Sequence, residues 1–143
     1  PGRLEVVRRS PTVLIDVAHN PHGMQELSTA VSEAFSFRRL VGVVGVLGDK
    51  DAEGMLVALE PVLDEVVITQ SSSPRSIDAE DLAELAIDVF GDERVRVEPS
   101  LPDAIEAAVT AAESEGDLEG VGLLVTGSVT VAGEARALLR PRR

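Results

Sequence analysis

The stretch Leu14–Met24 reads LIDVAHNPHGM and contains both histidines of this 143-residue chain. An apolar run leads into it, and Asp16, His19 and Asn20 then follow within five positions. Asparagine is a good helix N-cap and proline suits the first helical position, so Asn20 and Pro21 predict a helix start. Such a start presents unpaired N–H groups and the positive end of the helix dipole, which favour an anionic ligand.

Each of these residues also has a purely structural interpretation. Asn20 alone is most simply a cap, and His19 alone is more often a polar loop residue than a ligand-binding one. Asp16 is harder to explain in this way, because a carboxylate that faces a core needs a partner. The sequence TGS at Thr126–Ser128 is equally compatible with a site and with a tight turn that ends in a serine cap.

The glycine-rich stretch GVVGVLGDK at Gly42–Lys50 invites comparison with a phosphate-binding loop but fails the test for it. The motif G-x-x-x-x-G-K-[ST] needs a different glycine spacing, and a hydroxyl residue where this chain has Asp51. The stretch also does not open the long helix of a dinucleotide fingerprint. These glycines are therefore expected to be close-packing positions on a buried strand.

The candidate residues stand at the ends of apolar, β-branched segments that alternate with helical patterns. This alternation predicts a three-layer αβα Rossmann-like domain, with a mostly parallel sheet of about six strands and helices on both faces. The expected strands are Leu4–Val7, Val13–Val17, Leu40–Leu47, Val66–Thr69, Val95–Val97 and Val121–Thr126. The expected helices cover Met24–Phe35, Met55–Leu59, Leu82–Phe90, Leu101–Ala112 and Ser128–Leu139.

Ligands of such sheets bind outside the carboxyl ends of the strands. Four segments fall there and carry most of the unusual residues: DVAHNP, LGDKD, TQSSSPRS and TGSVT. Elsewhere, Ser100 and Asp78 are expected to cap the helices that follow them, because short side-chain oxygens accept first-turn N–H groups. The apolar stripe that includes Ile105 is expected to face the core.

Composition excludes several classes of protein. Hydrophobic residues make up 44% of the chain, which is typical of a single folded domain of this length. The absence of cysteine excludes disulfides and thiolate metal sites, and no metal site is predicted. Aromatic residues are 2% and the net charge is −12, which disfavours nucleic-acid binding. No membrane span or signal peptide is recognisable, so a cytoplasmic location is expected.

Five motifs together resemble the C-terminal domain of the folylpolyglutamate synthase/dihydrofolate synthase family, which belongs to the Mur ligase superfamily of ATP-dependent amide ligases. Their order and spacing match over essentially the whole chain, residues 1–143. The cell-wall Mur ligases share a related Asp…Ala-His motif but resemble the rest of the chain less well. The motifs are PGRLEV (Pro1–Val6), LIDVAHNPHG (Leu14–Gly23), GVLGDKD (Gly45–Asp51), SPRS (Ser73–Ser76) and VTGSVTVAGEAR (Val125–Arg136).

The resemblance implies that ATP phosphorylates a carboxylate of dihydropteroate or folate, and that the amine of L-glutamate then attacks the acyl phosphate. A preceding phosphate-loop domain, to which this chain has no match, would grip ATP and bind most of the Mg²⁺. The domain of residues 1–143 would close over that site and would be inactive by itself. Whether the parent makes dihydrofolate, extends polyglutamate tails or does both stays open.

The resemblance also implies roles on the nucleotide side. Arg3 of PGR would lie at the interdomain hinge and contact the nucleotide, and Asp16 would contact its ribose. Asn20 would cap the helix whose N-terminus faces the ligand. Lys50 and Arg75 match basic positions of the DKD and PR loops, so both are expected to bind the nucleotide.

On the amino-acid side, the resemblance places His19 and Ser128 toward the incoming glutamate as catalytic residues. Two alternatives stay open. One is a cell-wall Mur ligase. The other is a stand-alone acidic regulatory module. Such a module would need a cluster of acidic residues at the strand ends, but the strand before His19 ends with only one, Asp16.

Overall fold

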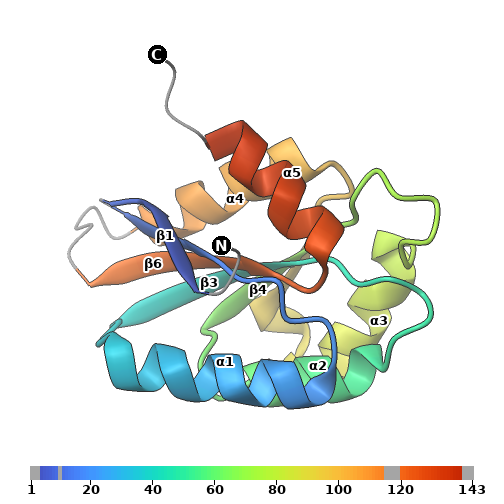
Figure 1. The fold of residues 1–143 in the computed structure, drawn as a ribbon, viewed down its shortest axis with the longest axis horizontal. Coiled ribbons are helices and arrows are strands. Elements are labelled where there is room, and N and C mark those ends of the chain that lie inside the picture. Colours follow the sequence, from blue (N-terminus) through green and yellow to red (C-terminus); the bar gives the residue numbers. More distant parts are fainter. Residues whose placement is uncertain (1–3, 10, 115–119, 140–143) are drawn as a thin grey trace.

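The structure is a computed structural model that describes residues 4–9, 11–114 and 120–139. Within these residues, six strands form one sheet and five α-helices cover it (Figure 1). The strands are β1 (Glu5–Arg8), β2 (Thr12–Ile15), β3 (Arg39–Val44), β4 (Glu65–Ile68), β5 (Val95–Val97) and β6 (Val121–Thr126). The helices are α1 (Pro21–Ala34), α2 (Ala52–Leu59), α3 (Ala79–Phe90), α4 (Leu101–Ala112) and α5 (Val129–Leu139), with a 3₁₀ turn η1 (Asp92–Arg94) before β5.

The strand order across the sheet is β1-β2-β6-β3-β4-β5. Every neighbouring pair is parallel except β1 and β2, which are antiparallel. The predicted mostly parallel six-stranded sheet is therefore confirmed. The antiparallel edge has a simple cause: a parallel connection needs a crossover of about a dozen residues, and only a few separate Arg8 from Thr12.

Helices lie on both faces of the sheet, as the three-layer prediction requires. Figure 1 shows α1 and α2 below the sheet and α4 and α5 above it. Side chains from α1, α2 and α3 pack into one apolar cluster with Leu124, whereas those from α4 and α5 pack into another with Leu123 and Val125. No helix in the described ranges is long and apolar enough to cross a membrane.

The glycines of Gly42–Lys50 pack closely, as predicted. A Cβ on Gly42 would lie 2.6 Å from Leu63 Cδ1, and one on Gly45 would lie 3.0 Å from the Thr69 carbonyl oxygen. The first part of this stretch is the buried strand β3, so it cannot wrap around a phosphate. Gly42 is thereby confirmed as a close-packing position on a buried strand. The expected strand Leu40–Leu47, however, ends at Val44, so Gly45 and Gly48 pack closely in the segment after it.

Ile105 provides a test of the core. It is 7% exposed and belongs to the cluster on the α4 and α5 face, so Ile105→Val is expected to lower the free energy of unfolding by about 0.5–1.5 kcal/mol. The matched control is Ile87→Val on α3, where the isoleucine is 37% exposed. That change should stay within about 0.5 kcal/mol. Urea unfolding measures both, and equal losses would mean that the α4 face has been misassigned.

Candidate functional site

The carboxyl ends of the parallel strands meet at one edge of the sheet. Beyond the last pair of β2 and β6, the Asp16 N–H still donates to the Val125 carbonyl at 3.1 Å. Gly127 has φ +118°, and a Cβ there would collide with the Gly45 carbonyl oxygen, so only glycine suits this position. The turn before Ser128 is thus pressed against the end of β3.

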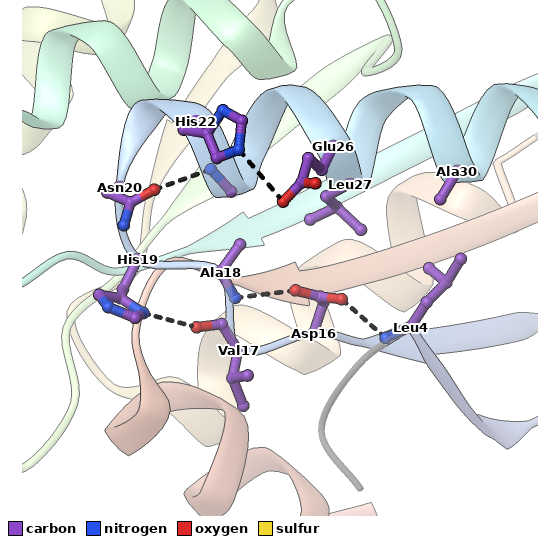
Figure 2. Close-up of a pocket in the computed structure, with 11 residues that line it drawn as sticks. Leu4, Asp16, Val17, Ala18, His19, Asn20, His22, Glu26, Leu27 and Ala30 are labelled. Carbon is purple, nitrogen blue, oxygen red and sulfur yellow. Dashed lines mark hydrogen bonds and ion pairs between the residues drawn. The ribbon is translucent and has the colours of Figure 1, made fainter.

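A cavity of about 370 Å³ lies between the end of β2 and the first turns of α1 (Figure 2). Asp16, His19 and Asn20 line it together, and Leu4 and Leu27 give it an apolar side. Three of the residues singled out from the sequence therefore surround one cavity at the ligand-binding edge. The mixture of a carboxylate, an imidazole and an apolar wall suits a ligand that is partly polar and partly flat or apolar.

Asp16 is 6% exposed, and its carboxylate has two backbone partners. Oδ2 accepts a hydrogen bond from the Leu4 N–H at 2.7 Å, and Oδ1 accepts one from the Ala18 N–H at 2.8 Å (Figure 2). These are the partners that a buried carboxylate requires. Each carboxylate oxygen can accept a second hydrogen bond, so Asp16 retains acceptor capacity toward the cavity.

The helix start predicted at Asn20 is confirmed. Asn20 has extended backbone angles, its Oδ1 accepts from the Gly23 N–H at 2.7 Å, and Pro21 occupies the first helical position. The preceding residue, His19, is exposed, and its Nδ1 lies 3.2 Å from the Val17 carbonyl oxygen. When Nδ1 donates to that carbonyl, Nε2 is left as an acceptor that can take a proton from a ligand.

Ser128 is 1% exposed and caps helix α5. Its Oγ accepts a hydrogen bond from the Val131 N–H at 3.0 Å, so the serine-cap interpretation is confirmed. The hydroxyl hydrogen is still free to donate, because a serine hydroxyl is both donor and acceptor. Ser128 does not line the cavity that Asp16 and His19 share, so its cap is observed while its contact with a ligand stays a prediction.

Two serines allow this cap to be tested. Ser128→Ala removes the bond to the Val131 N–H and is expected to cost about 1 kcal/mol of stability. Ser100 also stands at an N-cap, before α4, but its side chain makes no capping hydrogen bond, unlike the sequence prediction. Ser100→Ala should therefore change stability by less than about 0.5 kcal/mol. Thermal unfolding compares them, and a larger loss at Ser100 would contradict the assignment.

The two basic candidates lie in neighbouring loops. The Gly48 N–H donates to the Arg75 carbonyl at 2.7 Å, and the Arg75 guanidinium pairs with Asp49 Oδ2 at 2.9 Å. Both members of this ion pair are exposed, so it adds little stability by itself. The Lys50 ammonium has no hydrogen-bond or ion-pair partner in the described part of the chain. Sequence reasoning missed Asp49 as the partner of Arg75, although it lies next to Lys50.

The Lys50 loop lies beside the start of α1. Asp51 caps helix α2 by accepting from the Gly54 N–H at 2.9 Å. A Cβ on Gly54 would lie 2.9 Å from Pro21 Cγ, so the first turns of α1 and α2 touch. The N-termini of α1 and α2 thus lie side by side at this edge; the Asp51 carboxylate already occupies that of α2, whereas Asn20 leaves that of α1 without a charge.

A further contact was not anticipated from the sequence. The Glu134 carboxylate on α5 accepts hydrogen bonds from both the N–H and the hydroxyl of Ser72. The signal was the acidic residue within the last motif, GEAR. Through Glu134, helix α5 holds the serine-rich loop that carries Arg75.

Arg3 lies outside the described residues, so the structure does not place it. Among the residues that are described, no group of three or more histidine, aspartate or glutamate side chains is arranged to hold a metal ion.

One buried hydroxyl near the site has no partner in the described part of the chain. Thr126 is fully buried beside the carboxyl edge, and its Oγ1 has no hydrogen-bond partner within the described residues.

Comparisons with known proteins agree with this geometry. The family described as "Mur ligase, glutamate ligase domain" matches residues 2–129. The dihydrofolate synthase/folylpolyglutamate synthase of Mycobacterium tuberculosis is 50% identical to this chain. The alignment covers 96% of this chain and 30% of that protein. The chain therefore spans about a third or less of the length of such relatives.

Solved structures give the same result. Crystal structures of Mycobacterium tuberculosis folylpolyglutamate synthase complexed with ADP and AMPPCP superimpose with a TM-score of 0.95 and 49% identity, covering 99% of this chain and 33% of that chain. A bifunctional folylpolyglutamate synthase/dihydrofolate synthase with Mn, AMPPNP and L-glutamate bound gives a TM-score of 0.78 and 30% identity. That superposition covers 97% of this chain and 31% of the other. By its matched residues, its fold and the edge at which its motifs gather, this chain belongs to the Mur ligase glutamate ligase domain family.

Proposed function

We propose that this chain is the C-terminal domain of an ATP-dependent ligase that adds L-glutamate to dihydropteroate, to folate or to both. The observation that carries the proposal is the cavity at the carboxyl edge, which gathers Asp16, His19 and the N-terminus of α1. A carboxylate accepts from hydroxyl groups, while a helix N-terminus favours phosphate or carboxylate groups. Family membership makes a stand-alone regulatory module the weaker alternative.

The nucleotide would bind through five residues. Asp16 would accept from the ribose hydroxyls, for which its oxygens keep capacity. Lys50 and Arg75 would approach the phosphates, and Asn20 would fix the helix whose N–H groups face them. Arg3 would contact the nucleotide from the hinge. ADP and AMPPCP in the related Mycobacterium tuberculosis structures support a nucleotide role for the domain.

The incoming glutamate would bind near His19 and Ser128. Both stand at helix N-termini, where a carboxylate is favoured, and both keep a hydrogen-bonding atom that the fold does not use. His19 Nε2 would accept a proton from the amine as it attacks the acyl phosphate, and phosphate would then leave. L-Glutamate bound in a related structure supports an amino-acid site in this family.

The remaining machinery would lie in a preceding domain. That domain would supply the phosphate loop and most of the Mg²⁺ ligands. Closure of the two domains would bring their groups together and exclude water from the acyl phosphate, which water would otherwise hydrolyse. Magnesium would neutralise charge on the transferred phosphoryl group.

The test is substrate dependence in the full-length protein. Release of ADP and phosphate is expected only when ATP, L-glutamate and dihydropteroate or folate are all present, with a glutamylated product detected by mass spectrometry. Omission of each substrate in turn is the control. Turnover that instead requires a cell-wall peptide precursor would identify a cell-wall Mur ligase and contradict the proposal.

A further inference from the structure

Leu4, the first described residue, has an uncommon backbone conformation. Its φ is +46°, and it is the only non-glycine residue in the described ranges with a positive φ. A leucine side chain is disfavoured there, because its Cβ approaches the following carbonyl. Leu4 also lies directly before β1, and in the proposed two-domain protein the connection to the preceding domain would join on its N-terminal side. Some contact must hold this conformation.

Asp16 provides that contact. Its Oδ2 accepts from the Leu4 N–H at 2.7 Å, across twelve residues of sequence. The side chain is 6% exposed, so water competes little for this bond. In Figure 2 the carboxylate lies between Leu4 on one side and Ala18 on the other.

The second oxygen of Asp16 shapes the loop of the candidate site. Oδ1 accepts from the Ala18 N–H two residues on, which is the geometry of an Asx-turn. This turn ends β2 at Ile15 and leads directly into His19 and Asn20. One buried carboxylate therefore fixes both the start of the described chain and the site loop.

We propose that Asp16 is a positioning residue that couples the direction of the interdomain connection to the His19 loop, in addition to any contact with ribose. This inference rests on the proposed two-domain ligase. A carboxylate is needed because both oxygens act as acceptors at once, whereas an amide has only one oxygen. With Asp16 in place, the domain would approach its partner domain in a restricted range of orientations. The His19 side chain would then already be oriented toward the ligand.

Asp16→Asn separates this role from the ribose contact. The amide oxygen can keep the local bond to Ala18, but the amide nitrogen would then face the Leu4 N–H, donor against donor. Toward ribose, by contrast, an amide still offers hydrogen bonds. In the full-length protein, kcat is therefore expected to fall roughly tenfold, the scale of one lost charge-assisted hydrogen bond, with a KM for ATP near that of the wild type.

The decisive readout is the distance between the domains without nucleotide. The sequence of residues 1–143 has no cysteine, so a spin label can be attached to Glu84→Cys on the exposed side of α3, with a second label on the preceding domain. Double electron–electron resonance should give a broader distance distribution in Asp16→Asn than in the wild type. Asp16→Ser is the second variant, since a hydroxyl can maintain the local turn but is too short to reach Leu4.

The matched control is Glu106→Gln. Glu106 is exposed on α4, on the other face of the sheet from α1; it loses the same unit of charge and does not line the cavity. Its distance distribution and kcat should equal those of the wild type. Unchanged distributions in both Asp16 variants, or a raised KM for ATP with an unchanged kcat, would overturn the positioning role. Absence of ligase activity from the wild type would instead contradict the proposed function, which the distance measurement does not require.

Discussion

Purified residues 1–143 are expected to show no glutamate-dependent hydrolysis of ATP, with dihydropteroate or folate present, whereas the full-length protein turns over. The reason is the lack of a phosphate loop. The one glycine-rich stretch that approaches the motif, Gly42–Lys50, begins as the buried strand β3, and its glycines are packed against Leu63 and Thr69. The N-terminus of α1 and Lys50 can attract an anion but cannot enclose a triphosphate with its metal.

Phosphate release measures this difference directly. Residues 1–143 and the full-length protein should be assayed at the same concentration with the same three substrates. Addition of the separately purified preceding domain to residues 1–143 is the informative control, because partial recovery of turnover would locate the missing groups in that domain. Sustained turnover by residues 1–143, free of contaminating enzyme, would contradict the two-domain proposal.

Local signals in the sequence were sufficient for much of the fold. The start of α1 followed from Asn20 and Pro21, since a cap and a first-turn proline act on neighbouring residues. The sheet followed from the alternation of apolar strands with amphipathic helices. The strand ends were less accurate: β2 was expected to reach Val17 but ends at Ile15, because the Asp16 side chain bonds to the Ala18 N–H and turns the chain.

The contacts that complete the site depend on long-range pairing, which periodicity does not encode. The bond from Leu4 to Asp16 requires the antiparallel register of β1 against β2, in which Glu5 pairs with Ile15. The bonds from Ser72 to Glu134 join residues 62 positions apart. The sequence motifs identified which segments meet at the site. Which side chains bond to one another follows only from the folded structure.

The last prediction separates the nucleotide side of the site from the amino-acid side in the full-length protein. Asp16→Ala removes the proposed ribose acceptor, so the KM for ATP is expected to rise, in addition to any fall in kcat from its positioning role. His19→Ala and Ser128→Ala are expected to raise the KM for glutamate or lower kcat, while ATP binding is largely kept. Each lost hydrogen bond to a charged ligand should cost about 1.5–3 kcal/mol, or roughly one to two decades in kcat/KM.

The chain offers a close control for the histidine. His22 is the other histidine, it is exposed on the first turn of α1, and its ring makes only a long contact of 3.6 Å with Glu26. His22→Ala should therefore leave kcat and the KM for glutamate near wild-type values, and any effect should be confined to the KM for ATP, because His22 also lines the cavity. Steady-state kinetics with each substrate varied in turn, together with calorimetric titration of ATP, make the comparison at a temperature where every variant is folded.

If His19→Ala abolished ATP binding while the KM for glutamate stayed constant, the role given to His19 would be wrong. If Asp16→Ala, His19→Ala and Ser128→Ala all matched the wild type, these residues would serve only as turn formers and caps, because the bonds they make within the fold would then account for them completely.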